Sequence, residues 1–138
     1  MSENLRDNVP ALLGKSIDDD DVTSFLKTLD QAEAVRLNDL NEPRWISEDA
    51  GVVVYAAPKT RRIVTVFLYA EGYEGYKQYK GPLPHGLNFS MDMDAVKSCF
   101  PREPDASSEE HCAWDFDDYR LIVSFDGGIT DVTLTSDF

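Results

Sequence analysis

The sequence has only two cysteines and two histidines among its 138 residues. Two cysteines, Cys99 and Cys112, do not make the disulfide framework of a small secreted domain. With His111 they offer at most three soft metal ligands, whereas a structural zinc site needs four. The N-terminal residues lack the basic and apolar blocks of a signal peptide, and no apolar run approaches the roughly 20 residues of a membrane span. We therefore expect a cytoplasmic protein with reduced thiols, no metal, no cofactor and no membrane contact.

Motifs of the common enzyme classes are missing as well. The chain has no glycine-rich dinucleotide loop, no phosphate-binding loop and no serine or cysteine in a nucleophile elbow. The aspartates at 18–21 lack the alternating ligands and central glycine of a calcium loop and are typical of a helix start. Asp115, Asp117, Asp118 and Asp126 leave a paired-acid hydrolase open as an alternative. A solvated acidic surface is the preferred interpretation, and we expect no catalytic residues.

Acidic residues, by contrast, are abundant. The chain carries 26 aspartates and glutamates against 13 lysines and arginines, which gives a formal net charge of −13. A field of this sign repels nucleic acid and anionic membranes and steers cationic partners toward the protein. High solubility explains the same charge without any partner. Direct binding to nucleic acid is disfavoured under both interpretations.

A loose internal repeat relates residues 83–138 to residues 12–72. Each passage runs through an acidic helix start, a tryptophan and two strand-like segments separated by a turn. The predicted fold class is α+β, with two tandem helix-plus-antiparallel-sheet units packed as one compact body. The last strands of the two passages share an apolar skeleton, Ile63, Val66 and Leu68 against Ile129, Val132 and Leu134. The predicted boundaries are a flexible lead-in at 1–11, a first repeat at 12–72, a structured connector at 73–86 and a second repeat at 87–138.

Hydrophobic periodicity predicts the individual elements. Val22, Phe25, Leu26 and Leu29 follow helical spacing, which predicts an amphipathic helix over 19–30. A second helix is expected to begin at Ser90 as N-cap and to end at Pro101. Residues 63–69 are apolar on both faces, which predicts a central strand that is at least partly covered on both sides. Further strands are predicted at 44–46, 52–56, 113–116, 119–125 and 129–135, and a polar loop at 102–111.

The connector carries a recognisable pattern. Residues 79–89 read Tyr-Lys-Gly-Pro-Leu-Pro-His-Gly-Leu-Asn-Phe. This stretch resembles the Y-x-G-x-L-P-x-G-L-x-F connector of immunity proteins from bacterial polymorphic toxin systems. The tandem organisation resembles the β-lactamase inhibitory protein and the small outer-membrane assembly lipoprotein SmpA. The chain departs from these relatives in lacking the acylated N-terminal cysteine of the lipoprotein and the disulfides of the inhibitory protein.

The resemblance implies an immunity protein that neutralises a cognate, cationic toxin by stoichiometric occlusion. Aromatic anchors ringed by acidic groups are the residue types that such an interface needs. The alternative for the aromatic residues is packing between the repeats, and for Trp45 and Trp114 it is the core. A protein-interaction or adaptor module without a toxin is the rival function, and the oligomeric state is open. The candidate contacts are Tyr73, Tyr76, Tyr79 and Trp114 as anchors, with Glu109, Glu110, Asp115, Asp117 and Asp118 as charges.

Overall fold

The computed structural model describes residues 12–27, 36–37, 43–47, 51–57, 59–72, 75–79, 83–126 and 128–136. These residues form an α+β protein with two short α-helices and an antiparallel sheet, as the sequence predicts. None of the described helices is long and apolar enough to cross a membrane. In chain order the elements are α1 (Asp20–Lys27), β1 (Arg36–Leu37), β2 (Pro43–Ser47), β3 (Val52–Ala56), β4 (Ile63–Tyr69), the 3-10 helix η4 (Pro84–Gly86), α2 (Met93–Ser98), β5 (Ala106–Ser107), β6 (His111–Asp115), β7 (Arg120–Phe125) and β8 (Ile129–Thr135).

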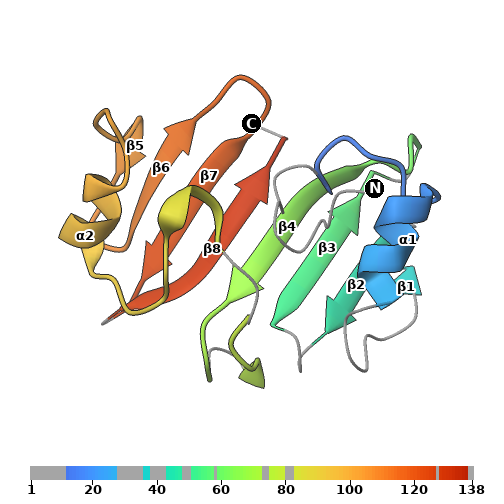
Figure 1. Ribbon diagram of the computed structural model, residues 1–138, viewed down its shortest axis with the longest axis horizontal. Coiled ribbons are helices and arrows are strands. Elements are labelled where there is room, and N and C mark those ends of the chain that lie inside the picture. Colours follow the sequence, from blue (N-terminus) through green and yellow to red (C-terminus); the bar gives the residue numbers. More distant parts are fainter. Residues whose placement is uncertain are drawn as a thin grey trace.

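The sheet joins the first and last parts of the chain through β4 and β8. In the described residues the strand order is β1-β2-β3-β4-β8-β7-β6-β5, and neighbouring strands are antiparallel (Figure 1). The central pair is in register from Thr65 opposite Thr135 to Tyr69 opposite Asp131. The outermost strands, β1 and β5, have two residues each, whereas the six strands between them have five to seven. The prediction that 63–69 is a central strand is confirmed.

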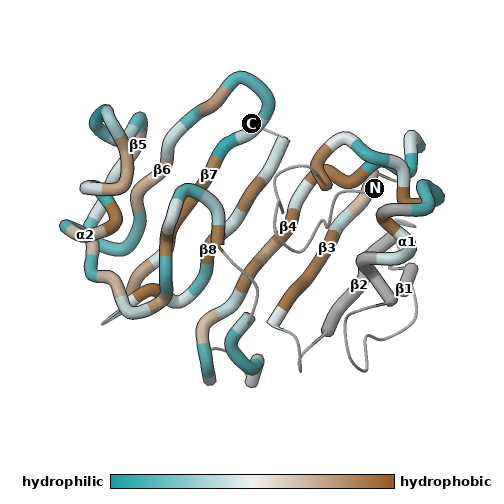
Figure 2. Tube along the Cα trace, viewed as in Figure 1, coloured by the Kyte–Doolittle hydropathy of each residue, from teal (hydrophilic) through white to brown (hydrophobic). Residues whose placement is uncertain are grey.

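Alternation along the strands gives the sheet two different faces. Val66 lies opposite Leu134, and Leu68 lies opposite Val132. All four side chains are fully buried in one hydrophobic cluster, and Ile63 and Ile129 belong to it too. The six skeleton residues of the sequence repeat therefore all point to one side, which we call the core face. Figure 2 shows the apolar stretches of β3, β4 and β8 side by side.

Both α-helices pack on the core face, over opposite ends of the sheet (Figure 1). Val22 of α1 and Val96 of α2 are fully buried in the same cluster. The start of α2 differs from the expectation at Ser90. Asp92 is the N-cap, because its carboxylate accepts a hydrogen bond from the Ala95 N–H at 2.8 Å. Ser90 instead donates its own N–H to the Asn88 side chain at 3.0 Å, within a turn that precedes the helix.

Most predicted strands lie where alternation places them, and one region differs. The bounds of β3, β4 and β8 match the predicted 52–56, 63–69 and 129–135. Residues 102–111, predicted as a polar loop, contain the short strand β5, whose Ala106 pairs with Ala113. A two-residue edge strand is fixed by its partner and not by its own sequence, so periodicity does not reveal it. The end of the helix predicted over 19–30 lies outside the described residues.

Candidate functional site

The side of the sheet opposite the helices carries a row of aromatic side chains, and we call it the aromatic face. Tyr55 of β3 meets Phe67 of β4 edge to face, with ring centroids 5.7 Å apart. Phe67 stacks on Tyr69 at 6.1 Å, and Tyr69 stacks on Tyr76 of the connector at 4.2 Å with an interplanar angle of 11°. All four residues are partly exposed. The row therefore presents an apolar strip on a sheet whose other side is buried.

Backbone contacts hold Tyr76 at the end of this row. The Gly72 N–H donates to the Tyr76 carbonyl at 2.8 Å, and the Tyr79 N–H donates to the Tyr69 carbonyl at 3.0 Å. Gly51, at the start of β3, has φ +69° and lies against the connector backbone. A Cβ atom on Gly51 would stand 2.2 Å from the Lys77 carbonyl oxygen. The close approach of the connector to the sheet therefore requires a glycine at this position.

A polar row continues from the aromatic row across the second half of the sheet. Tyr69 lies opposite Asp131, Asp131 opposite Ser124, and Ser124 opposite His111. Adjacent strands are about 4.8 Å apart, so these four positions span about 14 Å across β4, β8, β7 and β6. Because all four residues share one register row, their side chains lie on the same face as the aromatic strip.

A cavity of about 420 Å³ opens along this polar row. Its volume is in the range of sites that accept small ligands or partner side chains. The Asp131 carboxylate is oriented by two hydroxyls, since Thr130 Oγ1 and Thr133 Oγ1 each donate to it at 3.0 Å. The lining residues are Glu110, His111, Ser124, Phe125, Asp126, Thr130 and Asp131. The lining therefore includes three residues with carboxylate side chains and no lysine or arginine.

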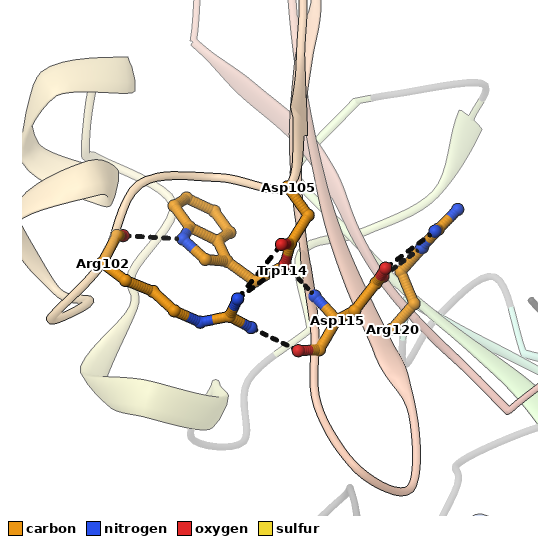
Figure 3. Close-up of polar contacts among 5 residues, drawn as sticks. All are labelled: Arg102, Asp105, Trp114, Asp115 and Arg120. Carbon is orange, nitrogen blue, oxygen red and sulfur yellow. Dashed lines mark hydrogen bonds and ion pairs between the residues drawn. The ribbon is translucent and has the colours of Figure 1, made fainter.

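A second polar cluster lies at the opposite end of β6 (Figure 3). Arg120 binds the Asp115 carboxylate through two nitrogens, and this contact holds the pKa of Asp115 below its usual range and raises that of Arg120. Arg102 donates to the Asp115 carbonyl and pairs with Asp105 at 3.0 Å. The Trp114 indole N–H donates to the Arg102 carbonyl at 3.1 Å. The charges of this cluster are matched internally, which makes it a structural element rather than an unsatisfied acidic site.

The predicted aromatic contacts divide into surface and core. Tyr76 belongs to the aromatic row, whereas Tyr79 is 4% exposed and lies in the hydrophobic cluster. Trp114 is fully buried and stacks on Phe100 with centroids 3.9 Å apart. The structure thus places Tyr79 and Trp114 where the packing alternative expects them. Tyr73 lies outside the described residues, and so does the side chain of Trp45.

The predicted charges separate to the two ends of β6. Glu109 and Glu110 are exposed before the strand, and Asp117 and Asp118 are exposed after it. The five residues of β6 keep these pairs roughly 17 Å apart. Glu110 lines the cavity, whereas Asp115 is bound by Arg120. The structure therefore does not gather the five predicted acids into one patch.

Sequence reasoning missed Tyr55, Phe67, Tyr69 and Asp131. A signal was present, since both faces of residues 63–69 are apolar and the aromatic residues alternate along one of them. The sequence predicts that residues 63–69 are at least partly covered on both faces, and the two faces are covered in different ways. Helices cover the core face, whereas on the other face aromatic neighbours partly bury Phe67 and Tyr69. Asp131 gave no signal, because its place beside Tyr69 comes from the pairing of distant strands.

The residues considered for metal and hydrolase chemistry lie at different places in the described part of the chain. His111 and Cys112 are consecutive residues of β6 and point to opposite faces, so they do not converge on one ion. Burial raises the pKa of the Cys112 thiol, an effect that the charge of Lys97 only partly offsets. Among the described residues, no group of three or more histidine, cysteine, aspartate or glutamate side chains is arranged to hold a metal. The cavity is lined by Asp126 but not by Asp115, Asp117 or Asp118.

His85 ties the connector to the second half of the chain. Its Nε2 is 2.7 Å from the Tyr119 hydroxyl, and its ring stacks on Phe116 with centroids 4.8 Å apart. The residue has φ +60°, a left-handed conformation that non-glycine residues rarely adopt. Burial lowers the pKa of His85, and it raises the pKa of Tyr119 together with the nearby charge of Asp118. This aromatic cluster has a structural role, because it holds the connector against the turn between β6 and β7.

Comparisons with known proteins add no assignment. The sequence matches no protein-family model, and no similar protein was found among curated proteins or among solved structures. The resemblance of residues 79–89 to immunity proteins therefore stays a prediction from the sequence. The described residues combine an aromatic strip with an acidic cavity on one face of the sheet.

Proposed function

We propose that this protein is an immunity protein that neutralises a cationic bacterial toxin by stoichiometric occlusion. The observation that supports the proposal best is the row of partly exposed aromatic side chains on the face opposite the helices. Tyrosine and tryptophan are enriched among the residues that dominate binding energy at interfaces. A net charge of −13 adds electrostatic steering toward a basic partner.

We further propose that the chain consists of two tandem units of the kind found in the β-lactamase inhibitory protein. The element order supports this, since one helix and four strands are followed by a second helix and four strands in the described residues. The strand order is symmetric about the β4–β8 pair, which is what two similar units meeting edge to edge would give. The skeleton residues of both passages of the sequence repeat lie on the core face, as two such units would require.

Co-expression with the adjacent open reading frame tests the proposed function. We expect the protein to rescue growth from toxicity of that gene product and to co-purify with it at a fixed stoichiometry. Binding should weaken as salt rises, because steering between opposite charges is screened. Tyr76→Ala should weaken binding by at least tenfold, as expected for loss of an aromatic anchor. Ser98→Ala, an exposed change on α2 on the other side of the sheet, should leave it unchanged.

The outcomes separate immunity from the rival function. Co-purification without growth rescue would favour a protein-interaction or adaptor module. Rescue without a stable complex would contradict occlusion and would revive the hydrolase alternative. Equal effects of Tyr76→Ala and Ser98→Ala on a complex that does form would remove the aromatic face from the interface while leaving immunity itself in place.

A further inference from the structure

We infer that the second half of the chain, residues 83–138, steers a basic protein toward the sheet, while the aromatic row over β3, β4 and the connector holds it there. The inference deepens the proposed function and rests on it in one respect, since it takes the partner to be a cationic protein. It adds the kind of partner that this surface fits, a protein whose basic region lies to one side of its apolar contact. Three observations support it: the division of charge along the chain, the exposure of the charged side chains, and the width of the sheet.

The negative charge of the protein is concentrated in the second half. Residues 83–138 contain twelve aspartates and glutamates and three lysines and arginines, which gives a net charge of −9. The first half, residues 12–72, contains eleven acidic and seven basic residues, which gives a net charge of −4. The second half is also the shorter of the two, so it carries more negative charge per residue.

Most of the negative charge of the second half faces solvent. Nine of its eleven described acidic residues are exposed, and they lie around α2, at both ends of β6 and at the end of β7. Two of its three cations are held by acidic neighbours, since Arg120 binds Asp115 and Arg102 pairs with Asp105. The exposed acids elsewhere in this half therefore set the field that a partner meets.

The first half, by contrast, carries exposed cations beside its exposed acids. Lys59, Arg61 and Arg62 are exposed on the turn between β3 and β4. Arg61 pairs with Asp18 at 3.4 Å, close to the start of α1. A cationic partner that approaches this part of the molecule therefore meets charges of both signs.

The sheet is wide enough for the two halves to act as separate electrostatic regions. The strand order places them side by side, with α1 and α2 over opposite ends (Figure 1). Adjacent strands are about 4.8 Å apart, so the middles of the two four-stranded halves are about 19 Å apart. Screening reduces the interaction between exposed charges beyond about 10 Å at 0.1 M salt. An approaching cation therefore responds mainly to the nearer half, and the stronger attraction lies over β5, β6 and β7.

Steering and anchoring affect different rate constants. Long-range attraction between opposite charges raises the association rate, whereas contacts within a formed interface act mainly on dissociation. The acids of the second half supply the first effect, and the aromatic row supplies the second. The partner that fits both regions carries its basic groups about 19 Å to one side of the apolar surface that meets the aromatic row.

Paramagnetic relaxation of the backbone amides tests the division of charge without any toxin. The full protein is measured with a nitroxide that carries an ammonium group and with a matching nitroxide that carries a carboxylate. We expect the ratio of the cationic to the anionic effect to be at least about twofold higher over residues 91–126 than over residues 12–27 and 59–72. A smaller difference between the two halves would overturn the inference, whatever the toxin does.

Matched double variants extend the test to the toxin complex. Asp117→Asn with Asp118→Asn, and Asp19→Asn with Asp20→Asn, each remove two exposed charges, the first pair from the second half and the second pair from the first half. At about 0.1 M salt, we expect the Asp117 and Asp118 variant to associate with the toxin at least about threefold more slowly than the Asp19 and Asp20 variant. Tyr76→Ala should instead accelerate dissociation at least about tenfold.

The outcomes keep the inference and the proposed function apart. A smaller difference in association rate between the two double variants would overturn the steering role and leave immunity in place, and unchanged dissociation of Tyr76→Ala would overturn the anchoring role. A missing toxin complex, with a probe ratio that still differs between the halves, would overturn the proposed function alone. If the Asp117 and Asp118 variant does not fold, Glu109→Gln with Glu110→Gln removes two other exposed charges from the same half.

Discussion

Replacing Gly51 with alanine should detach the connector from the sheet. Gly51 has φ +69°, and an added Cβ would lie 2.2 Å from the Lys77 carbonyl oxygen and 2.7 Å from the Tyr79 nitrogen. Both neighbours are backbone atoms, so rotation of a side chain does not relieve the clash. The connector would have to shift, and the hydrogen bond from the Tyr79 N–H to the Tyr69 carbonyl would be lost or weakened.

Three terms give the magnitude of this effect. The left-handed conformation costs alanine about 1–2 kcal/mol. A lost hydrogen bond costs about 1 kcal/mol, and partial exposure of the buried Tyr79 ring costs about 1–2 kcal/mol. The lower chain entropy of alanine in the unfolded state returns about 0.4–1 kcal/mol. We therefore expect the free energy of unfolding to fall by about 2–4.5 kcal/mol, which is a large part of the ~5–15 kcal/mol typical of a domain.

Urea unfolding followed by tryptophan fluorescence measures this change, and Gly14→Ala is its matched control. Gly14 has φ +85°, but an added Cβ would meet nothing within 4 Å. Its substitution carries the backbone strain alone, about 1–2 kcal/mol before the entropy return. We expect Gly51→Ala to lose about 2–3 kcal/mol more than Gly14→Ala, which is the sum of the hydrogen-bond and burial terms. Equal losses in the two variants would refute the close packing of the connector on the sheet.

Three further predictions concern the core and two titrating groups. Leu134→Ala should lower the free energy of unfolding by about 2–5 kcal/mol, because Leu134 is fully buried at the β4–β8 pair. Burial lowers the pKa of His85, so the unfolded state binds the proton more readily than the folded state does. The free energy of unfolding should therefore be highest above about pH 6.5 and should decrease as pH falls below that value. His85→Gln should reduce this decrease, which urea unfolding midpoints measured at several pH values would show. Arg120 lowers the pKa of Asp115, so the stability gained from this ion pair should be present above about pH 4 and be lost as pH falls further. The free energy of unfolding of Asp115→Asn should therefore equal that of the parent protein only at acidic pH.

Each of these three predictions has a clear contradicting result. A loss below 1 kcal/mol for Leu134→Ala would mean that the β4–β8 pair is not at the centre of the core. Identical pH profiles for His85→Gln and the parent protein would show that His85 is as well solvated in the folded state as in the unfolded one. A difference in the free energy of unfolding between Asp115→Asn and the parent protein that stays constant from pH 2 to pH 7 would show that the Arg120 contact does not depend on the charge of Asp115.

The alternation of apolar and polar residues predicted the strands well where the packing of neighbouring strands favours the same alternation. In β3, β4 and β8, the residues that alternate toward the core face are also those that pair across strands, so sequence and tertiary structure agree. The short strand at Ala106–Ser107 was not predicted, since both residues are exposed and only pairing with β6 defines it. The N-cap of α2 was placed two residues early, because serine and aspartate are both good caps and the sequence does not rank them.

The candidate site was only partly predictable, for a reason that is specific to sheets. The connector composition indicated Tyr76, but a strand that is apolar on both sides does not reveal which side the helices cover. The helices place Val22 and Val96 on the opposite face, and this arrangement, which the strand sequence does not encode, leaves Tyr69 and Phe67 partly exposed. Trp114 shows the converse, since its aromatic character suggested an anchor and its burial places it in the core.

The pairing of β4 with β8 explains both the architecture and the composition of the candidate site. The pairing joins the last strand of each half at the centre of the sheet. The outer edges of the described sheet are therefore the two-residue strands β1 and β5, which offer little backbone for further pairing. The same pairing sets Tyr69 opposite Asp131. The aromatic surface therefore comes from the first half of the chain and the carboxylate cavity from the second. Neither half contains both parts, so any ligand that needs the two together binds only when β4 and β8 are joined.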